Sequence, residues 1–242
     1  KGGSLKIRAA RALIGNSGTP LPAGWGAETL VLDPGIFTRG GFTDYSVEGY
    51  DALTVAANTI IRPDYAGWQL KNSALAQSSG SNVKDLANEV VLPWQLRAPM
   101  KLALKSGNNF ASSGGVQFGQ LAVGTGAVID VGPQGSIDLS AGNLLTVDGS
   151  LTAVAGSISL ALAQVGDWYR DNRAIWVGSH ARLDVSGIAK QLPSTTGLRE
   201  GEVLQGGTIS LSAGTGTLDG KNYAGAGNVV IQARTDAQAT LD

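Results

Sequence analysis

Three acidic residues stand at the centre of short apolar triplets and are the first candidates for chemistry. Asp130, Asp138 and Asp184 each lie between two apolar residues. Paired carboxylates on one outer face of a sheet could carry out acid–base chemistry or bind calcium. Alternation by itself, however, requires a polar residue at the centre of a half-buried strand, and such acids also discourage lateral strand association. We therefore expect all three to be solvated residues that face outward.

The remaining motifs with catalytic potential are weak. The single histidine, His180, has no serine or cysteine nucleophile motif nearby and is a poor candidate for a general base. The glycine-rich stretch 214–222 is one residue short of a phosphate-binding loop and has Asn222 where that loop has Ser or Thr, so we expect a turn. The chain has no cysteine, which removes thiolate metal sites. We expect no enzyme activity, no metal and no cofactor.

One aromatic and basic segment could contact a partner. It combines aromatic faces with guanidinium groups, which is chemistry that can hold a carbohydrate or a protein. The alternative, which we favour, is that its tryptophans anchor the loop to the body of the protein. The residues of this possible contact loop are Trp168, Tyr169, Arg170, Arg173 and Trp176.

The elements that would position these residues are short, glycine-bounded strands. From Ala127 onward, apolar and small polar residues alternate in triplets, which is the pattern of half-buried strands. Ile129 and Leu151 are 22 positions apart, and about 20 residues form one turn of a solenoid. An antiparallel meander is also compatible with the triplets. They are Ile129–Val131, Ile137–Leu139, Leu145–Val147, Leu151–Ala153 and Ile158–Leu160.

Similar patterns bracket the whole chain. They recur at 2–9, 52–61, 99–104, 182–187, 206–214 and 228–233. Between them lie non-repeating insertions at roughly 14–50, 62–98, 163–178, 188–205 and 218–226, which contain every Trp and Tyr. Within the second insertion, Val83 to Val91 could be a short helix. The sequence predicts an all-β chain, a right-handed parallel β-helix whose insertions are loops packed on the rod. We expect residues 1–242 to be one segment excised from a longer repeat protein.

The composition limits the classes of partner. The 18 Lys and Arg residues nearly balance the 19 Asp and Glu residues, and charged residues are only 15% of the chain. Without a basic stripe, the phosphate-neutralising contribution that dominates nucleic-acid affinity is missing, so we expect no nucleic-acid partner. No apolar run approaches the 18 residues or so that would span a bilayer. The 35 glycines show no three-residue period, which excludes collagen and indicates turns.

The phrases Gly-Gly-Thr-Ile-Ser-Leu-Ser-Ala-Gly at 206–214, Leu-Asp-Val-Ser-Gly at 183–187 and Phe-Thr-Asp-Tyr-Ser-Val-Glu-Gly-Tyr-Asp-Ala-Leu-Thr-Val at 42–55 resemble the filamentous haemagglutinin family. These adhesins are two-partner-secretion exoproteins. The resemblance implies export through an outer-membrane secretion pore, location at the bacterial cell surface or in the medium, and a role in cell adhesion and virulence. The family's secretion domain carries an Asn-Pro motif that this chain lacks, so the resemblance implies an internal shaft segment.

The expected partners are a receptor or glycan on a host or neighbouring cell, together with flanking β-helix coils. Two alternatives remain open. The first is a β-helical carbohydrate-active enzyme, a polysaccharide lyase or glycosidase, although the Gly-His-Gly and Arg-Ile-Lys segments of such hydrolases do not occur here. The second is the shaft of a contact-dependent toxin delivery protein whose effector lies elsewhere.

Overall fold

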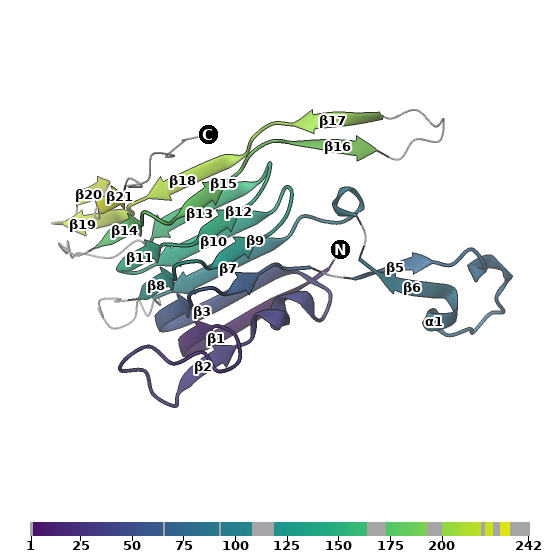
Figure 1. Ribbon diagram of the computed structural model, residues 1–242, viewed down its shortest axis with the longest axis horizontal. Helices are drawn as coiled ribbons and strands as arrows, with labels where there is room; N and C mark the ends of the chain where they lie inside the picture. Colours follow the sequence, from purple (N-terminus) through teal and green to yellow (C-terminus); the bar gives the residue numbers. More distant parts are fainter. Residues whose placement is uncertain are drawn as a thin grey trace.

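The chain is mostly β. The computed structural model describes residues 2–64, 66–91, 93–107, 119–163, 173–192, 200–218, 221–224 and 228–232. Strands account for 51% and helices for 8% of the structure. The dominant element is a large sheet of parallel strands that is nearly closed, like a barrel. Its strands lie one above another through the body of the molecule (Figure 1).

The parallel strands fall into three columns, and within each column neighbouring strands pair with one another. The first column holds β1 (Gly3–Ile14), β3 (Phe42–Val55), β7 (Lys101–Ser106), β10 (Ser136–Ala141), β13 (Ser157–Leu162) and β18 (Thr208–Ser212). The second column begins with the second halves of β1 and β3 and continues through β8 (Gln120–Val123), β11 (Leu144–Val147), β14 (Ala174–Val177) and β21 (Asn228–Ile231). The third column is a smaller sheet of β4 (Ile60–Ile61), β9 (Val128–Asp130), β12 (Ser150–Thr152) and β15 (Arg182–Asp184).

The large sheet bends at its longest strand. The first half of β3 pairs with β7, whereas its second half, from Ala52, pairs with β8. Gly49 lies at this bend, where a Cβ would collide with the carbonyl oxygen of Ala52. The bend allows the first two columns to enclose one core.

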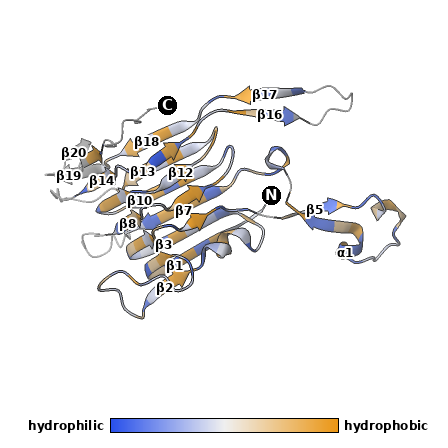
Figure 2. Ribbon diagram, viewed as in Figure 1, coloured by the Kyte–Doolittle hydropathy of each residue, from blue (hydrophilic) through white to orange (hydrophobic). Residues whose placement is uncertain are grey.

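The core consists of stacked apolar side chains from the inward positions of the strands. Ile137 of β10 is in register with Leu102 of β7 and Ile158 of β13, and all three are fully buried. Burial of each such side chain contributes roughly 1.5–3 kcal/mol. Figure 2 shows the resulting hydrophobic colouring along the stacked strands. The predicted alternating triplets are therefore strands. Leu151, which lies 22 positions after Ile129, pairs with Ile129 in a parallel ladder, as a solenoid turn of that length predicts.

Glycines occupy one corner of the stack. Gly135, Gly156 and Gly207 each precede a first-column strand, and a Cβ on Gly156 or Gly207 would collide with the carbonyl oxygen of the glycine in the preceding repeat. The same corner is held by hydrogen bonds of 3.0 Å from Ser157 N to Gly135 O and from Thr208 N to Gly156 O. Only glycine permits this close approach of the backbones.

The first insertion covers part of one end of the stack. Strand β1 lies between two strands that follow it in the chain. β3 pairs with one edge of β1, and β2 (Thr29–Leu32) pairs with the other edge. The 3-10 helix η1 (Pro34–Thr38) then inserts Phe37, which is fully buried and packs edge to face against Tyr45 at 5.3 Å. The insertion ends before residue 50, because β3 begins at Phe42.

Other insertions form antiparallel hairpins. The arm consists of β5 (Gly67–Leu70), η2 (Ala74–Ala76), α1 (Val83–Leu86) and β6 (Ala87–Val90), and η3 (Trp94–Leu96) returns the chain to the stack. A second hairpin pairs β16 (Ile188–Leu192) with β17 (Glu200–Leu204), and a third pairs β19 (Thr215–Leu218) with β20 (Lys221–Ala224). The first two hairpins project from the same side of the stack (Figure 1).

Three expectations from the sequence need correction. The short helix expected over Val83–Val91 ends at Leu86, because Ala87–Val90 pairs with β5 instead. Tyr45 and Tyr50 belong to β3 and not to an insertion. The insertion at 163–178 is shorter than predicted, because β14 takes Ala174–Val177 into the large sheet.

Candidate binding surface

The predicted contact loop is described only in its last part. Trp168, Tyr169 and Arg170 lie outside the described residues. Trp176 lies on β14 with its side chain on the outer face, 37% exposed, in register with Thr146 of β11. Trp176 is therefore accessible to a partner on the second column of the sheet.

Arg173 has a different position from the one we expected, because it is 1% exposed. Its Nε donates to the carbonyl oxygen of Gly142 at 3.3 Å, and its Nη2 donates to that of Ala163 at 2.6 Å. Burial lowers the pKa of the guanidinium. These bonds join two successive repeats through their backbones, so the side chain of Arg173 does not present its charge to a surface partner. A lone arginine in a polar segment gives no sequence signal for this burial.

The acids in the triplets do not form a pair. Asp130 and Asp184 share one row of the smaller sheet but are separated by Thr152. Asp130 accepts a 3.0 Å hydrogen bond from Gly132 N, and Asp184 accepts one of 3.0 Å from Ser186 N. The latter bond is the main reason why the pKa of Asp184 lies below its ordinary value. Both carboxylates thus close turns that follow strands.

His180 belongs to a polar column that runs across three repeats. The carboxylate of Asp148 accepts a hydrogen bond from the hydroxyl of Thr125, a 3.2 Å bond from His180 N, and lies 3.3 Å from His180 Nδ1. The bond from Thr125 is the largest contribution that lowers the pKa of Asp148. Asp148 therefore lies between the hydroxyl of Thr125 and the imidazole of His180, and both contact its carboxylate.

The first column carries a charged outer face, which we define as the outward side chains of β1, β3, β7 and β10. The charge alternates from strand to strand. Strand β1 contributes Lys6 and Arg8, β3 contributes Asp44 and Glu48, β7 contributes Lys101 and Lys105, and β10 contributes Asp138. Of the three acids singled out in the sequence, only Asp138 lies on this face, whereas Asp130 and Asp184 lie on the smaller sheet.

The charged outer face contains a groove of about 410 Å³. Its middle row, read by register, runs from Lys6 through the small residues Ser46 and Ala103 to Asp138. Rows two residues away on either side hold Asp44 with Lys101 and Glu48 with Lys105. Arg8 Nε lies 2.9 Å from Glu48 Oε2. Small side chains between long charged ones make a trough with both donors and acceptors along its sides.

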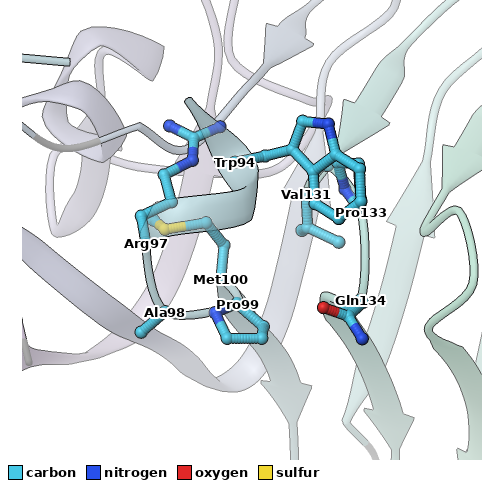
Figure 3. A pocket seen from close by; sticks show the side chains of 9 residues that line it. Trp94, Arg97, Ala98, Pro99, Met100, Val131, Pro133 and Gln134 are labelled. Carbon is cyan, nitrogen blue, oxygen red and sulfur yellow. The ribbon is translucent and has the colours of Figure 1, made fainter. Parts of the chain in front are cut away.

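A second depression is too small for a ligand. It lies between η3 and the turn at 131–134, has a volume of about 10 Å³, and is lined by Trp94, Arg97, Met100 and Pro133 among others (Figure 3). That volume holds about one water molecule. Arg97 forms an ion pair with Asp64, which joins the segments that lead into and out of the arm.

The arm presents exposed apolar side chains, namely Trp68, Leu70, Leu75, Val83 and Val91.

Among the residues that the structure describes, no three His, Asp or Glu side chains are grouped to hold a metal ion. No helix in the described ranges is long and apolar enough to cross a bilayer.

Comparison with known proteins gives no relative. The chain matches no family model, no curated protein and no solved structure. The trough on the charged outer face is the largest depression described above, and it is the candidate binding surface.

Proposed function

We propose that this chain is a segment of right-handed parallel β-helix from a large secreted bacterial surface protein, and that it acts as a non-catalytic shaft that contacts glycans. The observation that carries the proposal is the parallel, in-register pairing of strands from successive repeats in all three columns. Parallel strands joined by crossovers in one sheet are right-handed in about 98% of cases. The resemblance of 42–55, 183–187 and 206–214 to filamentous haemagglutinins supports a two-partner-secretion exoprotein.

The stacked geometry suits a shaft. Each repeat rests mainly on its neighbours, so stability adds repeat by repeat and folding can proceed from one end of a chain as it emerges from a pore. Such folding suits the outer-membrane secretion pore and the surface location that the resemblance implies. The chain has no cysteine and therefore no disulfides, so at that location its stability would come from the hydrogen-bonded ladders between repeats.

The trough on the charged outer face supports contact with an acidic glycan. Lys101 and Lys105 can pair with carboxylate or sulfate groups, whereas Asp44, Glu48 and Asp138 can accept hydrogen bonds from sugar hydroxyls. Of the three candidate acids, Asp130 and Asp184 accept hydrogen bonds that close turns. Asp138 lies in register between Ala103 and Ser159, with no carboxylate beside it on either neighbouring strand. This favours binding without cleavage over the alternative of a carbohydrate-active enzyme.

A glycan array tests this function. The labelled chain is applied to sulfated, uronic-acid and neutral glycans, beside a Lys101→Ser/Lys105→Ser variant and a Lys71→Ser/Lys84→Ser control that removes two lysines from the arm. We expect binding to acidic glycans, about fivefold or more weaker in the first variant and unchanged in the control. Equal binding by all three proteins, or loss in the control alone, contradicts the assignment to this face. Release of reducing ends from any bound glycan favours the enzyme instead.

A further inference from the structure

One edge of the first strand has no partner over most of its length. β1 pairs with β3 from Gly3 to Ile14, but on its other edge β2 pairs only with Arg11–Ile14. No other strand in the described ranges pairs with the stretch Gly3–Ala10, which we call the free edge. Unpaired backbone N–H and C=O groups in such an edge can accept an added strand.

The side chains at the free edge are less buried than their counterparts within the stack. Leu5 and Ile7 point toward the core and are only partly buried. Their register partners on β3, Tyr45 and Val47, are 2% and 1% exposed. A strand added to the free edge would bury Leu5 and Ile7 as β1 buries Tyr45 and Val47.

The charges on the outer face indicate what that strand must carry. Along the column, basic β1 is followed by acidic β3, basic β7 and acidic β10. Opposite charges on neighbouring strands are favourable and like charges are unfavourable. Lys6 has no ion-pair partner in the described part of the chain. A strand next to the free edge therefore fits best when its outward residues are acidic.

We propose that the free edge of β1 binds an extended segment that alternates apolar with acidic side chains, as an added parallel strand. The inference rests on the proposed shaft function and specifies the chemistry of the strand that adds to this edge of the stack. Strand β3 provides the natural probe, because its segment Phe42–Tyr50 already pairs with the opposite edge of β1.

A labelled peptide copying residues 42–50 tests the proposal against the full chain. We expect saturable binding that weakens with salt, because the contacts are exposed ion pairs. A peptide with Lys in place of Asp44 and Glu48 is expected to bind about five- to tenfold more weakly. A peptide N-methylated at alternate residues cannot form the ladder and is expected not to bind.

Protein variants locate the site. Lys6→Glu is expected to reduce the preference for the acidic peptide, whereas Lys84→Glu, the same charge change in the arm, leaves it unchanged. Hydrogen exchange on peptide binding is expected to slow within 3–10. Absence of saturable binding, equal binding of the acidic and lysine peptides, or protection at β18 instead would overturn the proposal. Slow hydrogen exchange in β7–β14, with or without peptide, shows that the stack is intact. In that case a lack of peptide binding counts against the free-edge proposal and not against the proposed shaft.

Discussion

The Nη2 atom of Arg173 donates a 2.6 Å hydrogen bond to the carbonyl oxygen of Ala163, so a buried guanidinium joins the start of β14 to the end of β13. Its Nε bonds to Gly142 O in the preceding repeat. This arginine stabilises the corner between the first and second columns.

Replacing Arg173 with Leu is expected to lower the free energy of unfolding by about 1–3 kcal/mol, because buried carbonyl groups lose their donor. Denaturant-induced unfolding followed by circular dichroism measures this change. Arg182→Leu is the control, since Arg182 is largely exposed and its ion pair with Asp184 is worth little. Equal effects of the two substitutions would show that Arg173 is not a structural link.

The glycine corner gives a second prediction. Gly156→Ala places a methyl group against the carbonyl oxygen of Gly135, and the repeats must separate to accept it. We expect destabilisation of about 1–3 kcal/mol in the same unfolding experiment. For Gly206→Ala, the added Cβ would lie at an ordinary 3.4 Å from Val185 O, and a much smaller effect is expected. If both variants unfold at the wild-type denaturant concentration, the repeats are not in close contact there.

Stability is expected to fall in acid. The pKa values of Asp148 and Asp184 are both below the ordinary value of 3.8 in the folded chain. Each carboxylate therefore stabilises the fold above about pH 4, and this stabilisation is lost as the pH falls through the lowered folded-state pKa. We expect Asp148→Asn to reduce stability at pH 6 and to flatten the decline between pH 5 and pH 2.

Thermal unfolding over that pH range measures the effect. Asp85→Asn provides the comparison, because the side chain of Asp85 makes no ion pair in the described structure. A pH profile of Asp148→Asn that runs parallel to that of the unsubstituted chain would contradict the role of the Thr125 and His180 bonds.

Charge alternation across the outer face gives a fourth prediction. Glu48 lies in register between Arg8 and Lys105. Glu48→Lys places three like charges in one row and is expected to cost about 1 kcal/mol or more, whereas Glu48→Gln costs less. The difference between the two variants is expected to shrink in 1 M salt, where the Debye length is about 3 Å. A difference that persists in high salt would mean that shape, and not charge, distinguishes the two variants.

The strands were predictable where the signal is local. In Ile137-Asp138-Leu139 and Ile158-Ser159-Leu160, alternation with flanking glycines is enough to define a strand and its inward face. The position of β2 was not predictable, because its pairing with the far edge of β1 depends on contacts distant in sequence. The charged outer face was missed for a similar reason. Lys6, Asp44, Lys101 and Asp138 are separated by insertions of unequal length, and only the register brings them together.

The parallel, in-register stacking of repeats is the central claim, and a pair of introduced cysteines tests it most directly. The chain has no cysteine of its own, so any disulfide reports the new pair. Asp138 of β10 is in register with Ser159 of β13, and neighbouring strands lie about 4.8 Å apart, within the range that a disulfide spans. Oxidation of the Asp138→Cys/Ser159→Cys variant is expected to give nearly complete disulfide formation. The Asp138→Cys/Ser157→Cys variant, in which the second cysteine is shifted by two residues, is expected to form little disulfide. Free thiols in the first variant together with a disulfide in the second would contradict the account.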